Sequence, residues 1–149
     1  MKGKIGTDAI MNNEIINIAY NIKTDNTEKM RILINWIKKL QKGRSIVDVL
    51  IDNNIDGIIV YGVAELGQLL IYEALEKDYP IYAIVDKKIQ YGDYMYRNIP
   101  IINISRLKSE QYKNKMVVIT AMSFYQEIAK KLEKMDIRNY IGITELLKE

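Results

Sequence analysis

A short segment with two glycines, in the first half of the chain, has the spacing of a turn that could hold a phosphate group. It follows an apolar, β-branched run and precedes an amphipathic stretch, so it would join a buried strand to a helix. Gly62 would form the tight turn, and Gly67 would let the helix pack closely on the strand. Val63, Ala64 and Glu65 lie between them, where backbone N–H groups at the start of a helix attract an anion.

Four further side chains stand where other strands of the same sheet would end. Asp86 ends an apolar run 19 residues after Gly67, where a carboxylate would bind a ribose hydroxyl. Lys87 follows it and would bind an extra phosphate or remain a solvated surface side chain. Thr120 and Ser123 follow a later apolar run, and Ser123 has the alternative role of a helix cap. Together with the turn, these residues predict a nucleotide-type binding site.

Two residues of the turn depart from the glycine spacing of dinucleotide-binding motifs. Ala64 occupies the second glycine position, where the backbone approaches a pyrophosphate, and it adds one methyl group there. Glu65 places negative charge in the first turn of the helix, which suits the helix dipole but competes with a bound anion. Two interpretations therefore stay open: a nucleotide site, or a turn whose glycines serve only the backbone and the packing.

The 149 residues include no cysteine and no histidine. In this chain that excludes disulfides, zinc–thiolate sites, a cysteine nucleophile, a histidine base and a histidine-ligated metal. The Tyr-x-x-x-Lys spacing of short-chain dehydrogenases is absent as well, since Glu76 follows Tyr72 and Ala129 follows Tyr125 at that offset. We therefore predict no catalytic residue and no metal site, and we expect that the isolated chain is not an enzyme.

Charge and hydropathy narrow the environment and the partners. The formal net charge of +3 is spread along the chain, which gives no reason to expect nucleic-acid binding. The apolar runs are far shorter than the roughly 20 residues of a membrane-spanning helix. The first residues lack the apolar core of a signal peptide. We expect a cytoplasmic protein with no membrane span.

Residues 57–149 alternate short apolar runs with amphipathic stretches, which is typical of an α/β fold with a parallel sheet of about five strands flanked by helices. Pro100 lacks the N–H that a central strand needs, so its strand is predicted to lie at an edge. Tyr91, Tyr94 and Tyr96 fall in a predicted polar loop, where they would stack on a base or simply pack. The predicted strands are 57–62, 81–86, 99–102, 116–120 and 139–143, and the main helices between them are 66–77, with Leu66, Leu69, Leu70 and Ala74 facing inward, and 123–135.

Residues 1–56 are predicted to form a helical segment that precedes this sheet. Its clearest helix spans 27–42, begins at Thr27 as N-cap and carries an apolar stripe. The stripe would pack on the rest of the domain or on the same helix of a second subunit, and both alternatives stay open. The stripe consists of Met30, Leu33, Ile37 and Leu40.

Two further helices are predicted in the same segment. Isoleucines between residues 10 and 22 have helical spacing, although β-branched residues and asparagines make a weak helix there. Ser45 and Asp48 have the spacing of a capping box that opens a short helix. In that helix Ile46, Val49 and Leu50 would turn inward.

Several of these elements together resemble a known class of domain. They are Trp36 and residues 43–46, 59–67, 84–87, 99–101 and 117–120. Over about three-quarters of its length the chain resembles the small Rossmann-like domains associated with bacterial surface-polysaccharide glycosyltransferases. Similar domains form the N-terminal, NAD(P)-binding-like part of nucleotide-sugar dehydratases and sugar acetyltransferases.

The resemblance implies a nucleotide or nucleotide-sugar binding module in bacterial capsule or cell-wall glycan biosynthesis. Its ligand would be NAD(P) or a nucleotide sugar, and a glycosyltransferase would be a partner. By position, Gly62, Ala64, Glu65, Gly67 and Asp86 carry over as ligand residues, and no catalytic residue does. Two alternatives stay open: an NAD(P)-dependent nucleotide-sugar-modifying enzyme completed by a partner or dimer mate, and a non-catalytic interaction protein with a vestigial pocket.

Overall fold

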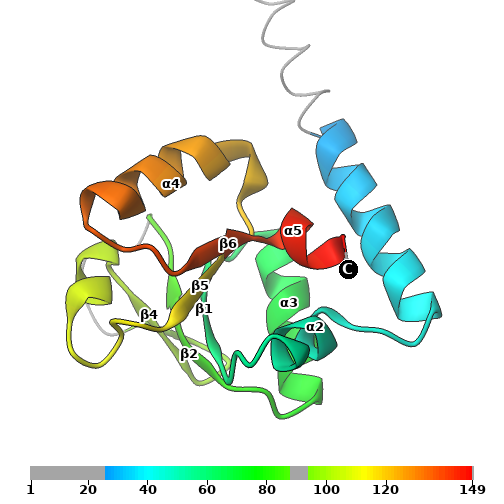
Figure 1. Ribbon diagram of the computed structural model, residues 1–149, viewed down its shortest axis with the longest axis horizontal. Helices are drawn as coiled ribbons and strands as arrows, with labels where there is room; N and C mark the ends of the chain where they lie inside the picture. The colour runs from blue at the N-terminus through cyan, green and yellow to red at the C-terminus, as the bar shows by residue number, and fades with distance from the viewer. Residues whose placement is uncertain (1–25, 88–93, 149) are drawn as a thin grey trace, which may run out of the picture.

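The computed structural model describes residues 26–87 and 94–148 and shows an α/β architecture with a six-stranded sheet flanked by helices (Figure 1). The sheet order is β3-β4-β2-β1-β5-β6, and every neighbouring pair is parallel except β3 and β4. The predicted α/β class is thereby confirmed; the sheet has six strands where about five were predicted, and it is mostly rather than wholly parallel. The strands are β1 (Ile58–Tyr61), β2 (Ile81–Val85), β3 (Tyr94–Tyr96), β4 (Ile99–Ile102), β5 (Met116–Ile119) and β6 (Tyr140–Gly142).

Helices cover both faces of the sheet. The central strand β1 is buried along its whole length, and its successive side chains point to opposite faces. Ile58 and Val60 pack in a core with helices 26–41, α2, α3 and α5, whereas Ile59 and Tyr61 pack with α4 and the 3₁₀ helix η1. The labelled helices are α2 (Ile46–Asp52), α3 (Glu65–Glu76), η1 (Ile104–Lys108), η2 (Met122–Phe124), α4 (Tyr125–Lys134) and α5 (Ile143–Leu147).

The prediction of a polar loop followed by an edge strand is wrong in its described part. Tyr94–Tyr96 form β3, which pairs antiparallel with β4, so β4 lies inside the sheet. The turn between them places Arg97 and Asn98 at φ values of 52° and 67°. Hairpins with two such residues favour Asn-Gly or Asp-Gly, and Arg-Asn lacks that signal. Pro100 lacks a backbone N–H, yet β4 still pairs with β2 on one side and β3 on the other. Tyr91 lies outside the described residues.

The helix over 26–41 buries a different face from the predicted stripe. Ile32 and Trp36 enter the core, whereas Met30, Ile37 and Leu40 are 57%, 54% and 48% exposed. The reason is that apolar residues surround much of this helix, so more than one side could be buried. The side that carries Trp36 is the one that packs against the core. Residue 27 is already helical, so the Thr27 N-cap is wrong too. The weak helix predicted within 1–25 lies outside the described residues.

The other helices agree more closely with the sequence. The capping box of α2 is confirmed, because the Ser45 hydroxyl accepts from the Asp48 N–H and the Asp48 carboxylate accepts from the Ser45 N–H. In α3 one predicted core residue is wrong: Leu69 is exposed, and Ile71 is buried in its place. No helix in the described ranges is both long enough and apolar enough to span a bilayer.

A part-buried carboxylate joins the first helix to the rest of the molecule. Glu73 of α3 accepts a hydrogen bond of 2.9 Å from the Trp36 indole N–H and one of 3.0 Å from the Val47 N–H of α2. One side chain therefore holds three helices in register. This contact anchors helix 26–41, whose first two turns reach the site described next.

Candidate functional site

A pocket of about 430 Å³ lies at the carboxyl ends of β1, β2 and β5. The strand order reverses at β1: the chain runs outward through β2 on one side and returns through β5 on the other. Open parallel sheets bind ligands in the crevice at such a reversal. All nine residues that the sequence singled out line this pocket: Gly62, Val63, Ala64, Glu65, Gly67, Asp86, Lys87, Thr120 and Ser123.

The turn between β1 and α3 has no room for side chains at its two glycines. Gly62 has φ of +112°, and a Cβ there would stand 2.8 Å from the Thr120 Oγ1. A Cβ on Gly67 would stand 2.0 Å from the Gly62 carbonyl oxygen. Helix α3 therefore approaches the turn as closely as two backbones can. Packing alone therefore requires both glycines.

Thr120 ties the end of β5 to this turn. Its side chain is 3% exposed, and its hydroxyl lies 3.0 Å from the Tyr61 carbonyl oxygen and 3.1 Å from that of Gly62. Its backbone N–H also donates to Tyr61 at 3.0 Å. The hydroxyl is thus engaged with the backbone, so Thr120 shapes the turn from beneath.

One end of the pocket is the start of α3, which has no side-chain cap. Ala64 is the N-cap residue, and its methyl group forms no cap hydrogen bond. The Glu65 carboxylate accepts a 2.8 Å hydrogen bond from the Lys29 ammonium of helix 26–41. That bond, together with the backbone N–H of Glu65 itself, holds the pKa of Glu65 below its ordinary value. Lys29 thus compensates the charge that would otherwise repel an anion at the helix start.

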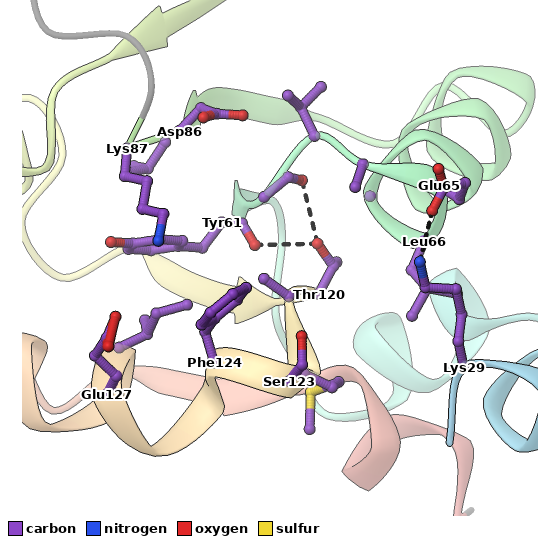
Figure 2. A pocket seen from close by; sticks show the side chains of 18 of the residues that line it. Lys29, Tyr61, Glu65, Leu66, Asp86, Lys87, Thr120, Ser123, Phe124 and Glu127 are labelled. Carbon is purple, nitrogen blue, oxygen red and sulfur yellow. Dashed lines mark hydrogen bonds and ion pairs between the residues drawn. The ribbon is translucent and has the colours of Figure 1, made fainter. Parts of the chain in front are cut away.

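The opposite end of the pocket is built from the residues after β2 and β5 (Figure 2). Asp86 and Lys87 follow β2, and the Lys87 ammonium lies 4.5 Å from the centroid of the Phe124 ring. Tyr61 contributes from β1; burial chiefly, and then the charges of Asp86 and Glu127, raise the pKa of its phenol. This end therefore combines carboxylates, a cation and an aromatic face.

Ser123 does not cap α4, which corrects the sequence prediction. Residues Met122–Phe124 form the short helix η2, Phe124 is the N-cap of α4, and no side chain caps it. The chain needs this extra turn to pass from β5 to α4, so the first turn of α4 starts later than the spacing to Gln126 suggested. Ser123 instead lines the pocket with an exposed side chain.

Several lining residues carry no signal that sequence reasoning could use. Glu28, Lys29 and Ile32 reach the pocket from helix 26–41, and they depend on how that helix docks. Phe124 and Glu127 depend on the insertion of η2.

Among the described residues, no cluster of three or more acidic side chains could hold a metal ion. The charged groups lining the pocket are Lys29, Lys87, Lys131, Glu28, Glu65, Asp86 and Glu127.

The pocket can therefore bind a ligand that is polar along its length and has a planar or apolar end. Backbone N–H groups at the start of α3 suit an anion, and carboxylates suit sugar hydroxyls. Its volume falls in the range of small-molecule sites, which is roughly 300–1,000 Å³.

Comparison with known proteins gives one family. The family described as "C2185-like, N-terminal" matches residues 54–141, which is more than half of the chain. The matched stretch contains the turn, β1 to β5 and the first two residues of β6, whereas Lys29 and its helix precede it. Neither the curated proteins nor the solved structures give a match.

Proposed function

The chain belongs to the C2185-like N-terminal family, and from the geometry of its pocket we propose that it binds a nucleotide or a nucleotide sugar. The carrying observation is the pocket at the point where the strand order reverses, with the 62–67 turn opening into it. We propose that the domain is Rossmann-like in this respect: a strand, a glycine turn and a helix start meet at the ligand.

The proposal assigns a place to each part of the ligand. The phosphates lie against the backbone N–H groups at the start of α3, which has no side-chain cap. The ribose hydroxyls bond to Asp86 at the end of β2. A sugar attached to the phosphates would extend from them on the side away from the ribose, past the start of α3.

The two residues at which the turn differs from a dinucleotide-binding motif, Ala64 and Glu65, are compatible with a bound anion. Ala64 carries its methyl group on an exposed position at the helix start, and Glu65 is turned to Lys29. The carboxylate is therefore paired within the protein, with Lys29 and with its own backbone N–H, so phosphate oxygens would meet the N–H groups of the residues that follow, beside a compensated charge. This pairing supports the nucleotide interpretation over a turn that serves only packing.

We further propose that this binding module works in bacterial surface-polysaccharide biosynthesis, in the cytoplasm and beside a glycosyltransferase. The support is the resemblance of the strand and turn segments to domains of that machinery. The module would present or retain an activated sugar, or respond to a nucleotide, while another chain carries the reaction. Under this proposal NAD(P) and nucleotide sugars are the ligands to test.

The experiment is a thermal-shift screen with NAD, NADP, UDP-sugars and CDP-sugars, followed by calorimetry on each ligand that shifts the transition. A ligand present at 100 times its Kd adds about 2.7 kcal/mol to the unfolding free energy. For a chain of this size each kcal/mol raises Tm by roughly 2–4 °C. We therefore expect a shift of several degrees.

A matched pair of variants locates the site. Asp86→Asn should weaken the binding about tenfold or more, because it removes a charged hydrogen-bond acceptor. Asp136→Asn makes the same change on an exposed residue beyond α4, and it should leave binding unaltered. If no nucleotide shifts the transition, the nucleotide proposal is wrong and the vestigial-pocket alternative is favoured. If a nucleotide binds and both variants bind it equally well, Asp86 is not a ligand residue and the proposed placement of the ribose is wrong.

A further inference from the structure

Phe124 is a large apolar side chain left open to the pocket. It is the single phenylalanine among the 149 residues, and it is 48% exposed at the end of η2. Burying such a side chain is favourable, so an aromatic ring held half in solvent leaves part of that gain unused. Its ring points into the same space as Asp86 and Glu127 (Figure 2).

The ring is already used as a binding surface within the molecule. Lys87 places its ammonium 4.5 Å from the ring centroid, which is the geometry of a cation–π contact. Lys87 is exposed and ends in a flexible chain of four methylene groups, so it can leave the ring at small cost. An aromatic face covered by a removable cation can accept a planar ring in its place.

The order of the residues along the pocket indicates which part of the ligand that planar ring belongs to. The Lys29–Glu65 pair and the start of α3 form one end, and Lys87 with Phe124 form the other (Figure 2). Asp86, which would hold the ribose, directly precedes Lys87. A nucleotide with its phosphates at the turn and its ribose at Asp86 thus carries its base toward Phe124.

We propose that Phe124 is the stacking surface for the base of the ligand, and that Lys87 moves off the ring when the base binds. This inference rests on the proposed function, and it adds the residue that holds the base. Stacking on an aromatic ring is tolerant of base identity, because every base has a π-face. Phe124 therefore contributes affinity for nucleosides in general, and the choice among bases falls to other contacts.

The first test compares ligands with and without a base. Binding of ADP, UDP, CDP and inorganic pyrophosphate is measured by calorimetry for the unmodified chain and for Phe124→Ala, Phe124→Leu and Phe124→Tyr. Phe124→Ala should weaken the nucleoside diphosphates that bind by about fivefold or more and leave pyrophosphate unchanged. Phe124→Tyr should restore the affinity and Phe124→Leu should restore it only in part, because leucine keeps volume without an aromatic face.

The second test asks whether Phe124 acts directly or through Lys87. In the Lys87→Met background, Phe124→Ala should still weaken nucleotide binding by a similar factor. If its effect vanishes there, the ring merely positions Lys87, and the stacking inference is overturned. Because Phe124 is the single phenylalanine, 4-fluorophenylalanine gives one fluorine resonance, which should shift with nucleotides and stay fixed with pyrophosphate.

The outcomes separate the two proposals. Nucleotide binding that Phe124→Ala leaves intact overturns the stacking role and retains the proposed function. An unmodified chain that binds no nucleotide overturns both. Loss of nucleotide binding with an unchanged pyrophosphate affinity supports both. Because Phe124 is half-exposed, its variants should still fold, and the melting temperature of each variant checks this.

Discussion

Single methyl groups matter most at the turn between β1 and α3. Helix propensity alone favours alanine over glycine inside a helix by about 1 kcal/mol, so Gly67→Ala would be stabilising if nothing touched it. Its Cβ would instead stand 2.0 Å from the Gly62 carbonyl oxygen, and backbone must shift to admit it. We expect Gly67→Ala to lower the free energy of unfolding by roughly 1–3 kcal/mol, measured by urea denaturation. Tyr72→Ala, on an exposed position of the same helix, is the control; a stabilised Gly67→Ala would contradict the packing described.

The Lys29–Glu65 pair governs how an anion meets the same turn. Glu65→Gln removes the carboxylate from the helix start and releases Lys29 toward the pocket, so it should raise the affinity for pyrophosphate. Lys29→Met leaves that carboxylate uncompensated and should lower it. Each change should amount to severalfold at low salt and shrink as salt is added, because both side chains are partly exposed. Calorimetry at two ionic strengths measures the pyrophosphate affinity, with Lys38→Met as the matched control on an exposed face of the same helix. Equal affinities of the unmodified chain, Glu65→Gln and Lys29→Met would contradict this prediction.

At the level of residues, the sequence could predict the site residues at the ends of the strands, but not those that helix 26–41 and η2 bring to the pocket. Gly62, Gly67 and Asp86 are tied to strand ends, and strand ends are marked by apolar runs that a sequence shows. Lys29 bonds to Glu65 across 36 positions, through a helix whose buried face was misassigned. Phe124 enters the pocket because η2 adds a turn before α4, which no spacing indicated. Side chains placed by docking of one element on another escape reasoning from local patterns.

Among the elements, α2 offers a pH test of a capping box. The backbone N–H of Ser45 bonds to the Asp48 carboxylate, and this contact, before the smaller opposing effect of burial, lowers the Asp48 pKa from 3.8. A lowered pKa in the folded state means that the carboxylate stabilises the fold above its unfolded pKa and loses that effect as pH falls through the folded value. The unfolding free energies of the unmodified chain and Asp48→Ala should therefore differ at pH 7 by about 0.5–2 kcal/mol. The difference should narrow below pH 3.8.

Asp48→Asn is the control for that titration. Asparagine keeps an acceptor for the Ser45 N–H, and its amide does not titrate. The stability difference between Asp48→Asn and Asp48→Ala should thus stay constant with pH, as followed by urea denaturation at each pH. A gap between the unmodified chain and Asp48→Ala that is equally wide at pH 2 and pH 7 would show that the carboxylate's charge is irrelevant to the cap.

The sheet could be predicted better than the helices that precede it, and the reason is geometric. A strand buried on both faces, such as β1, needs an unbroken apolar run, and the sequence displays it directly. The hairpin of β3 and β4 was missed because its turn uses Arg97 and Asn98 and its outer strand is largely exposed. Helix 26–41 has apolar residues around more than one face, so its periodicity allows several docking orientations. The hydrogen bond from Trp36 to Glu73 selects one of these orientations, and no local sequence pattern indicates that the two residues pair.

For the whole molecule, the remaining apolar face of helix 26–41 bears on the predicted homodimer. The sequence assigned the interface to Met30, Leu33, Ile37 and Leu40; Leu33 is partly buried, and the other three, with Ile34, stay exposed in one chain. If the dimer forms through this helix, its contacts are the exposed side chains. Ile37→Asp is then expected to convert a dimer into a monomer in light scattering at the same protein concentration.

The controls separate assembly from folding. Because Ile37 is exposed, Ile37→Asp should change the monomer's unfolding free energy by about 0.5 kcal/mol or less, whereas Ile32→Asp would bury a charge in the core and destabilise the fold severely. Lys38→Asp alters charge on the neighbouring polar face and should leave the dimer intact. The single tryptophan, Trp36, lies one residue from Ile37 and reports by its fluorescence whether the helix stays docked. A monomeric unmodified chain, or a dimer that survives Ile34→Asp and Ile37→Asp together while the fluorescence is unchanged, excludes this helix face as the interface.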